Sequence, residues 1–253
     1  QGEWASAATM GGCQSIDESE LDGTGKTAKV SPPGRSPALD AFDTPSAEGE
    51  ATSHLDWAQG EWDKPYPKPP IPVNDKERCE EVEKYKIMES DAEDVFDRLC
   101  DLTNEMLKAP FSAVDILDSK KHFFKSVSTS MALPEDIARE RGFPREASCC
   151  NYVLKMGRPL VVPDMAVDSV YDHNPLHTAL GFRFYAAAPL TAKSGHVIGT
   201  FCVLGDKPRS DFGEADVQRI QHIANTAMRQ IELRKEKLEA AGGAEEGRAA
   251  TTA

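Results

Sequence analysis

The sequence predicts an α+β fold, in which a central, mostly antiparallel sheet is flanked by helices and preceded by a disordered N-terminal tail. Apolar residues at helical spacing begin only near residue 75. Two hairpins of β-type runs follow, where an alternating α/β protein would place a helix between strands. A long amphipathic pattern then closes the folded part. Helices and strands are therefore segregated along the chain.

The first 75 residues are predicted to form a disordered tail rich in acids and proline. They combine Gly, Ser, Pro and acidic residues without a sustained apolar period. The segment DKPYPKPPIP favours polyproline II, either as a stiff spacer or as a ligand for an aromatic groove. The run ELDGTGKT ends like a phosphate-binding loop, but Glu20 occupies the place of the first glycine and no strand precedes it. We therefore expect no nucleotide loop.

Two amphipathic helices are predicted to open the folded part. The first has Asn74 or Asp75 as its N-cap and charged residues opposite its apolar face. The second is capped by Asp91 and stops at Pro110. The apolar stripes are Cys79, Val82, Tyr85 and Met88 in the first helix, and Val95, Phe96, Leu99, Leu102, Met106 and Leu107 in the second.

Two hairpins are predicted to build most of the sheet. The runs 111–117 and 122–128 are joined by a polar turn. The runs 182–192 and 196–206 are joined by Lys-Ser-Gly, a natural turn sequence. Both hairpins give neighbouring antiparallel strands.

A long connection is predicted between the two hairpins. Residues 131–146 are expected as a loop with one helical turn. A short helix follows, capped by Ser148 and ended by Gly157. A strand over 159–164 and a loop with a brief helix lead into the second hairpin.

A closing helix is predicted from Asp211 or Phe212 to Leu238. Its apolar residues recur every seven positions with others between them, as in a coiled-coil seam that Arg234 interrupts. The seam fits either homodimerisation through the terminal helices or packing on the domain core. It consists of Val217, Ile220, Ala224, Ala227, Ile231 and Leu238. We therefore assign residues 76–240 to the folded domain and 241–253 to a second disordered tail.

Charge and composition exclude several classes of protein. The formal net charge of -13 disfavours binding to nucleic acid or to an anionic membrane. No stretch approaches the roughly 20 apolar residues that a membrane span needs, and no targeting segment is recognisable. The chain begins at Gln1 rather than Met, as a fragment or a processed protein would. We expect a soluble, cytoplasmic protein.

The 6 cysteines form no CxxC pair and have no histidine at metal-ligand spacing. They are Cys13, Cys79, Cys100, Cys149, Cys150 and Cys202. We expect free, mostly buried thiols of a reducing compartment and no metal site.

Several separated motifs resemble those of the GAF domain family, in its bacterial-type group. They run in order over residues 76–238 and read as SxC, LVVPD, D-x-NP, RFYAxAPL and GTxCV. The matching residues are Ser148 and Cys150, Leu160 to Asp164, Asp172 with Asn174 and Pro175, Arg183 to Leu190, and Gly199 to Val203. GAF domains are regulatory modules that bind small ligands or bring partners together. The resemblance therefore implies a non-catalytic sensor or regulatory module in signal transduction.

The resemblance also implies a ligand cavity between the sheet and the connection over 126–182. The side chains expected to bind the ligand are Cys149, Cys150, Asn151, Tyr152, Asp164, Asp172, Asn174, Arg183 and Tyr185. Cys150 matches a cysteine common in this group and is expected to pack beneath the short helix, while the small Cys149 lies at the interior or the pocket edge. For Asp164, Asn174 and Arg183 a structural role stays open, because they readily tie turns or pair with each other.

The ligand itself is left unidentified, and neither bilin nor haem is expected. Bilin-binding relatives attach the pigment through a cysteine followed closely by histidine, whereas Asn151 and Tyr152 follow Cys150. The histidines expected at the surface or in loops, and so not as axial haem ligands, are His122, His173, His177, His196 and His222.

Two alternatives to the sensor remain open. Some small GAF proteins resemble methionine sulfoxide reductases, and adjacent Cys149 and Cys150 with Cys202 on a neighbouring strand suggest such a thiol enzyme. The cysteine spacing does not match that pattern, so an enzyme is not the leading hypothesis. The other alternative is an empty GAF scaffold within a larger complex, which would associate with a protein partner through its tail or its helices.

Overall fold

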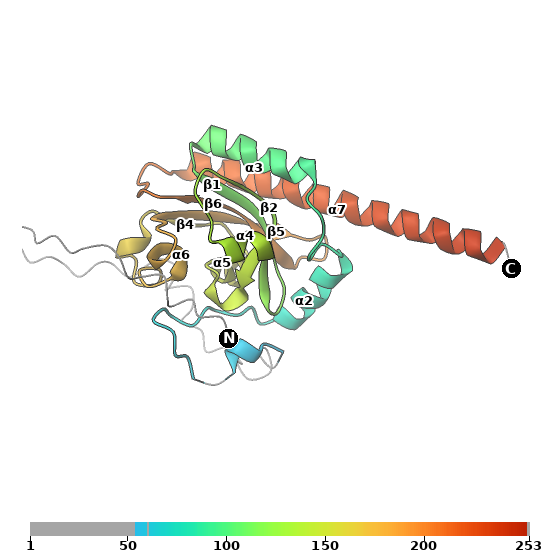
Figure 1. Cartoon of the computed structure of the whole chain (residues 1–253), viewed down its shortest axis with the longest axis horizontal. Coiled ribbons are helices and arrows are strands. Elements are labelled where there is room, and N and C mark those ends of the chain that lie inside the picture. The colour runs from blue at the N-terminus through green and yellow to red at the C-terminus, as the bar shows by residue number, and fades with distance from the viewer. Residues whose placement is uncertain (1–53, 60, 252–253) are drawn as a thin grey trace, which may run out of the picture.

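The computed structural model describes residues 54–59 and 61–251 (Figure 1). Its helices and strands are η2 (Asp56–Ala58), α2 (Asp75–Lys84), α3 (Asp94–Leu107), β1 (Phe111–Leu117), β2 (Lys121–Thr129), α4 (Glu135–Glu140), β3 (Gly142–Pro144), η3 (Arg145–Ala147), α5 (Cys150–Met156), β4 (Leu160–Val162), η4 (Met165–Val167), α6 (Pro175–Thr178), β5 (Phe184–Thr191), β6 (Val197–Gly205) and α7 (Glu214–Thr251).

A 6-stranded antiparallel sheet forms the centre of the fold, in the order β3-β2-β1-β6-β5-β4. Both predicted hairpins, β1 with β2 and β5 with β6, are confirmed. Strands β1 and β6 pair with each other and so join the hairpins into one sheet. At Gly199 of β6, an added Cβ would lie 1.9 Å from the carbonyl oxygen of Asp115 in β1. The close approach of these central strands therefore requires glycine at this position.

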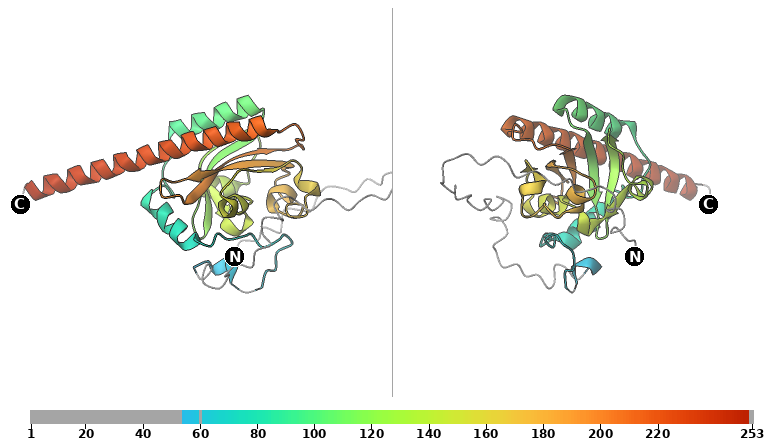
Figure 2. Two further views of the ribbon diagram at one scale, coloured as in Figure 1. Left: turned by 180° about the vertical axis from the view of Figure 1, so that it is seen from behind. Right: turned by 60° about the vertical axis from the view of Figure 1, so that its left-hand side comes forward.

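The sheet separates two cores. On one face, α3 and α7 lie side by side over the strands, and α2 lies at the end of the sheet (Figures 1 and 2). On the other face lie the short helices α4, α5 and α6 with their connecting loops. Alternation along each strand feeds both cores: Phe184 and Phe201 face the long helices, whereas Tyr185 and Cys202 face the short ones.

The two opening helices differ in detail from the prediction. Helix α2 ends at Lys84, because Lys86 and Glu89 adopt left-handed conformations with φ of 47° and 56°. Helix α3 begins at Asp94, so Asp91 is not its N-cap, and the main-chain oxygen of Asp91 instead accepts a hydrogen bond from Lys125 Nζ. The buried stripe of α3 is Phe96, Cys100, Thr103 and Leu107. Leu102 and Met106, predicted to face the core, are 61% and 51% exposed.

The connection over 131–146 contains more structure than the predicted helical turn. Helix α4 is followed by the short strand β3, which pairs with β2 and extends the sheet by one strand at its edge. A strand of three residues, Gly-Phe-Pro, is too short to show a two-residue alternation in the sequence.

Helix α7 packs its predicted seam on the domain core. Ile220, Ala224, Ala227 and Ile231 are buried against the sheet, whereas Leu238 is 42% exposed. The packing explanation of the seven-residue pattern is therefore correct for most of its length. The helix starts at Glu214 and continues beyond Leu238 to Thr251, past the predicted end, and its last part projects from the domain (Figure 1).

Residues 54–59 and 61–75 lie against the domain, although the sequence assigns them to the disordered tail. Leu55 and Tyr66 are buried, the Trp62 and Tyr66 rings meet edge to face at 5.5 Å, and Lys68 Nζ donates to the Ala58 carbonyl at 2.6 Å. The tail prediction therefore differs from the structure over this part. The run ELDGTGKT lies outside the described residues.

Within the described part of the chain, no helix combines the length and the apolar character needed to cross a bilayer. The cysteines found there, Cys79, Cys100, Cys149, Cys150 and Cys202, are all free thiols.

Candidate functional site

A small apolar cavity lies between the sheet and the short helices, where the ligand cavity was expected. Its volume is about 20 Å³. Its walls come from β1, β2, β5 and β6 on one side and from the α4, β3, α5 and α6 region on the other. It is lined by Phe111, His122, Phe124, Leu133, Ile137, Phe143, Cys150, Leu176, Leu180, Phe182, Tyr185, Cys202 and Leu204.

Of the predicted ligand-binding residues, Cys150 and Tyr185 line this cavity. Both side chains are buried, and the Tyr185 hydroxyl donates a hydrogen bond to Cys150 Sγ at 3.3 Å. The Ser148 hydroxyl oxygen accepts the Cys150 main-chain N–H at 3.0 Å. The N-cap of α5 is Cys149, so Ser148, the predicted cap, lies one residue before the cap position. Cys150 is thus held at the start of α5, where its sulfur faces the sheet.

Cys149, Asn151 and Tyr152 are buried beside the cavity and do not line it. The Asn151 side chain accepts a hydrogen bond from Arg145 Nε at 2.9 Å and donates to the Arg145 main-chain oxygen at 2.8 Å. The Tyr152 ring meets the Tyr171 ring edge to face at 5.3 Å. In this conformation these side chains therefore stabilise the fold around the cavity.

Asp164, Arg183 and Asn174 fix the loops below the sheet. Arg183 donates from Nε and Nη2 to the two oxygens of Asp164, at 2.7 and 2.6 Å. Those hydrogen bonds hold the pKa of Asp164 below its usual range, although partial burial opposes them. Asn174 accepts the Leu176 N–H at 3.0 Å and caps α6. Asp172 is half-buried and lies 2.8 Å from His173 Nδ1.

A buried polar cluster forms one wall of the cavity, and sequence reasoning missed most of it. Asp115 of β1 is fully buried, and its carboxylate accepts a hydrogen bond from Thr200 Oγ1 at 3.2 Å. His122 of β2 is 3% exposed, so the expectation of a surface or loop position for this histidine is wrong. Its Nε2 lies 3.1 Å from Asp115 Oδ1 and its Nδ1 lies 2.7 Å from Ser148 Oγ.

Electrostatics within this cluster are set by burial and by close partners. Desolvation raises the pKa of the Asp115 carboxyl. Burial alone would lower the pKa of His122, but the Asp115 charge outweighs burial and raises it to about 10. The pKa of Cys150 is lowered, because hydrogen bonds to Cys202 and His122 outweigh desolvation. Asp115 and His122 come from β1 and β2 and lie outside the motifs recognised in the sequence, whereas Cys150 and Cys202 belong to two of those motifs.

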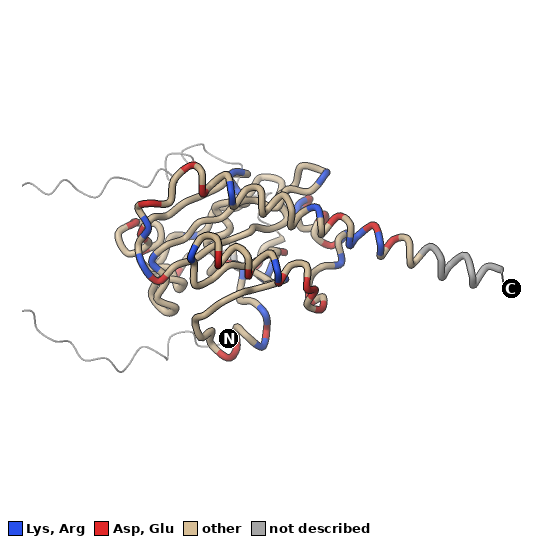
Figure 3. Tube along the Cα trace, turned by 90° about the horizontal axis from the view of Figure 1, so that it is seen from above, with Lys and Arg blue, Asp and Glu red and all other residues tan. Residues whose placement is uncertain are grey.

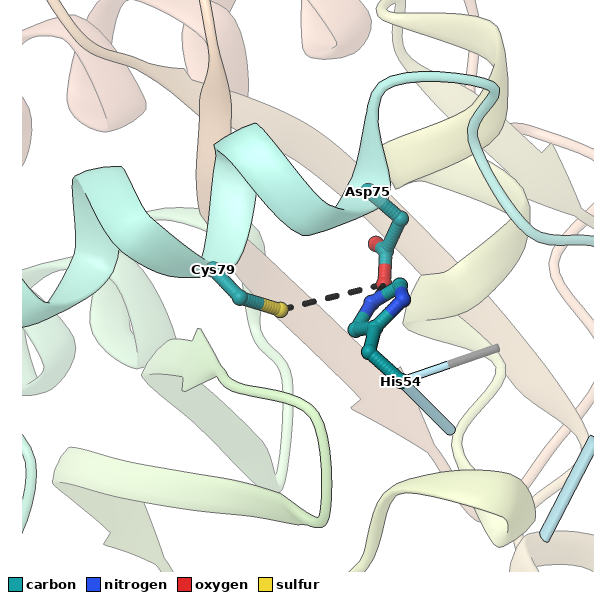
Figure 4. A group of neighbouring side chains, drawn as sticks. All are labelled: His54, Asp75 and Cys79. Carbon is teal, nitrogen blue, oxygen red and sulfur yellow. Dashed lines mark hydrogen bonds and ion pairs between the residues drawn. The ribbon is translucent and has the colours of Figure 1, made fainter. Parts of the chain in front are cut away.

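A second cluster surrounds Asp75 at the start of α2, and Figure 4 shows two of its members, His54 and Cys79, beside the Asp75 carboxylate. Arg145 binds both carboxylate oxygens of Asp75, at 2.7 and 2.8 Å, and Arg78 Nε lies 2.7 Å from one of them. His54 Nε2 lies 2.9 Å from Asp75, and the Cys79 sulfur lies 3.8 Å away. The two buried guanidinium groups make a cation site improbable on electrostatic grounds, so this cluster is an ion-pair network.

The Asp75 network ties α2 to the connection that covers the cavity. Burial would raise the pKa of Asp75, but the hydrogen bonds from Arg145 and the Arg78 charge hold it well below its usual range. Arg145 also donates to the Asp118 carbonyl at 2.9 Å, and Arg78 donates to the Leu117 carbonyl. The end of β1 is therefore fixed to η3, the turn before α5.

A six-stranded antiparallel sheet with long helices on one face and short helices over a small cavity on the other defines an α+β domain. The family model described as GAF domain matches residues 91–231. The chain therefore belongs to the GAF domain family.

One curated relative is a cyclic di-GMP phosphodiesterase of Pseudomonas aeruginosa, which is 30% identical over 164 residues. The match covers 64% of this chain and 27% of the relative, so it spans about a quarter of that protein's length. Two solved structures are also similar. The blue-light absorbing PixJ GAF domain of Thermosynechococcus elongatus has a TM-score of 0.47 at 16% identity, covering 66% of this chain and 94% of its own. A free methionine-R-sulfoxide reductase of Neisseria meningitidis has a TM-score of 0.45 at 16% identity, covering 66% and 90%.

Proposed function

We propose that this chain acts as a non-catalytic sensor or regulatory GAF module that binds a small ligand in the cavity below the sheet. The observation that carries the proposal is the cavity itself, with apolar walls and a few buried polar groups at one side. This combination is typical of small-molecule sites, in which apolar surface supplies affinity and polar groups fix orientation. The similarity to part of a phosphodiesterase supports a signalling context for the module.

The size of the cavity restricts how a ligand enters. A volume of about 20 Å³ holds about one water molecule, whereas sites for larger ligands enclose roughly 300–1,000 Å³. A larger ligand therefore requires displacement of the segments that cover the cavity. Leu133, Ile137, Leu176 and Leu180 belong to these segments and contribute only apolar contacts to the wall. Their movement breaks no ion pair.

We further propose that the module forms a homodimer through its long helices. Val95, Leu102 and Met106 lie on the solvent side of α3 and are 38%, 61% and 51% exposed. Val95 also lines a groove of about 250 Å³ together with Leu233 and Leu238 of α7. Apolar residues grouped in this way on two adjacent helices favour burial against a second copy. The predicted seam itself is unavailable, because it packs on the sheet.

The surrounding surface suits contact between proteins. Basic and acidic residues are interspersed over residues 232–239 of α7. Both charges are visible along the coloured part of this helix in Figure 3. Such a mixed surface lacks the single-sign field that would favour nucleic acid or an anionic membrane. A signalling protein partner on these helices is the corresponding alternative to a second copy.

The thiol-enzyme alternative has less support. Cys149, Cys150 and Cys202 are at most 3% exposed, and a reactive thiol needs access to its substrate. Burial also raises the pKa of the Cys149 and Cys202 thiols well above the ordinary value. A test for sulfoxide reduction by the unmodified chain separates the two functions, because a sensor gives no turnover.

Native mass spectrometry of the gently purified full chain tests both proposals, because it reads bound mass and oligomeric state together. A dimer carrying one small molecule per chain supports a sensor. For the interface, Leu102→Lys and Met106→Lys should shift the dimer toward monomer, whereas Val73→Lys should not. Val73 is a matched control because it is 68% exposed and lies outside α3 and α7. A bare monomer at all concentrations would contradict both proposals.

A further inference from the structure

The buried cluster beside the cavity contains an arrangement that hydrogen bonding does not explain. Asp115 Oδ1 and His122 Nε2 lie 3.1 Å apart. Neither atom has a hydrogen-bond partner within the described part of the chain. Both residues are almost completely buried. Unsatisfied buried polar atoms are costly, so two of them facing each other require an explanation.

The contact of the other ring nitrogen of His122 limits how Nε2 can interact with Asp115. His122 Nδ1 lies 2.7 Å from Ser148 Oγ, which also accepts the Cys150 main-chain N–H. The Asp115 charge raises the pKa of His122, so the ring of the metal-free protein is protonated. When a metal cation displaces the Nε2 proton and Nδ1–H donates to Ser148 Oγ, Nε2 carries a lone pair that faces a carboxylate oxygen. The lone pair of His122 Nε2 and the carboxylate oxygen of Asp115 then face each other without a proton between them. A cation bound between these two atoms would satisfy both.

A third ligand atom completes the set. Cys150 Sγ lies 3.9 Å from Asp115 Oδ2. The ligand atoms of Asp115, His122 and Cys150 all lie within 4.8 Å of one another. Zinc bonds of about 2.0–2.3 Å in a tetrahedron place neighbouring ligand atoms roughly 3.3–3.6 Å apart. The 3.1 Å separation involves Asp115 Oδ1 and the 3.9 Å separation involves Oδ2, so the carboxylate has to turn to offer one oxygen to a metal shared with His122 and Cys150.

We propose that Asp115, His122 and Cys150 form a site for one divalent transition metal, with Zn²⁺ as the best match, whose fourth position faces the apolar cavity. Carboxylate, imidazole and thiolate are a donor set that suits this class of metal. Three protein ligands with one open position are typical of sites that exchange a small ligand. Cys150 and His122 line the cavity, which has room for about one water at that position.

Charge balance favours the metal. A carboxylate and a thiolate carry two negative charges in a fully buried place, and an isolated pair of this kind is strongly unfavourable. A divalent cation with a neutral imidazole makes the site neutral. Binding releases to solvent the protons that the metal-free site holds on His122 Nε2 and on the Cys150 thiol, because neutral imidazole and thiolate are the ligands.

Outer hydrogen bonds already orient the proposed ligands. Ser148 fixes the His122 ring through Nδ1, and Thr200 Oγ1 donates to Asp115 Oδ2 at 3.2 Å. Groups that orient metal ligands in this way typically change affinity by about 10–100-fold when removed. His54, Asp75 and Cys79 are the other cluster with suitable donor atoms, but Arg78 and Arg145 already bind its carboxylate. The inference is independent of the proposed sensor role.

The test measures metal binding by the full chain after treatment with a chelator. Zn²⁺ affinity is read by competition with a chromophoric chelator, and Co²⁺ substitution reports a thiolate ligand through its charge-transfer absorption. We expect one metal per chain with this absorption. Cys150→Ser and His122→Gln should each lower affinity more than about 100-fold, beyond the loss of an outer-shell partner.

Matched variants locate the site and separate binding from folding. Cys149→Ser removes an equally buried neighbouring thiol, and His54→Ala removes the other cluster, so both should bind as the unmodified chain does. Thr200→Val keeps every ligand and should weaken metal binding about 10–100-fold. This variant still tests the site if Cys150→Ser fails to fold. Absence of stoichiometric metal in the unmodified chain, or unchanged affinity in Thr200→Val together with His122→Gln, would overturn the proposal.

Discussion

The two faces of the sheet are built from the same strands but carry different kinds of buried side chains. The face under α2, α3 and α7 is filled by apolar side chains of the strands and helices. The face under α4, α5 and α6 contains Asp115, His122 and the thiols of Cys150 and Cys202 beside an apolar cavity. Polar groups are costly to bury, so a cluster of them beside a cavity supports the proposed ligand site on that face. The helical face instead supplies stability.

Neighbouring residues of β6 give the largest test of this comparison. Phe201 faces the long helices and Cys202 faces the cavity, and both are buried. Phe201→Ala should lower the free energy of unfolding by about 3–5 kcal/mol, because it opens a cavity in a packed core. Cys202→Ala removes one sulfur beside existing space and should cost about 1 kcal/mol. Urea unfolding measures both, and equal losses would contradict the division between the faces.

The buried ionic cluster gives the next test. In metal-free protein, His122→Leu should lower the free energy of unfolding by about 3 kcal/mol, because Asp115 loses its partner in a buried place. The double change Asp115→Leu with His122→Leu should recover part of that loss, since neither polar group remains. A double variant that is less stable than His122→Leu would show that the pair itself stabilises the fold. Chemical denaturation of the three proteins gives the comparison.

The Asp75 network predicts how the cover of the cavity responds to acid. The folded-state pKa of Asp75 lies below its usual value, so its contribution to stability is complete above about pH 4 and is lost as the pH falls further. The loss should be at most about 1.4 kcal/mol per pH unit. Asp75→Asn should be less stable at pH 7 and should lack this part of the acid dependence. Unfolding curves at pH 7, 4 and 3 test the slope, and parallel curves for the two proteins would contradict it.

Tyr185→Phe tests the smallest contribution on the cavity side. The change removes one hydroxyl that donates to Cys150 Sγ at 3.3 Å and leaves the ring in place. We expect a loss of about 0.5–1.5 kcal/mol in the free energy of unfolding. Tyr66→Phe is a suitable control, because Tyr66 is buried outside both sheet cores. A larger effect would show that the hydroxyl organises the cluster beyond this one bond.

Much of the fold follows from local patterns in the sequence. The β-type runs 182–192 and 196–206, joined by Lys-Ser-Gly, predict a hairpin, and the structure confirms it. The edge strand β3 could not be predicted, because its pairing with β2 depends on the chain returning after α4. The stripe of α3 was misplaced because Leu102 and Met106 are apolar but face solvent. The period of apolar residues predicts that a helix forms. Which side of the helix faces the core depends on tertiary packing.

The site was less accessible to sequence reasoning. Cys150 was predicted, because it belongs to a recognisable motif before α5. His122 and Asp115 lie in strands whose polar residues resemble ordinary exposed positions of an alternating pattern. Only the folding of β1, β2 and α5 onto one another brings these groups within reach of a common point. Buried charge of this kind is a tertiary property, for which a single sequence carries no local signal.

The direction in which each side of the projecting helix α7 faces is fixed by the packing of its first part on the sheet. Helix α7 has 38 residues, which corresponds to about 57 Å at about 1.5 Å per residue. Successive residues turn by about 100°, so two residues inserted beyond Leu238 would rotate the distal face by roughly 200°. An insertion of seven residues would return that face to within about 20° of its original direction. Because the first part of α7 is held on the sheet, its rotation about the helix axis is fixed. The number of residues beyond that part then determines the direction in which a given side chain at the far end points.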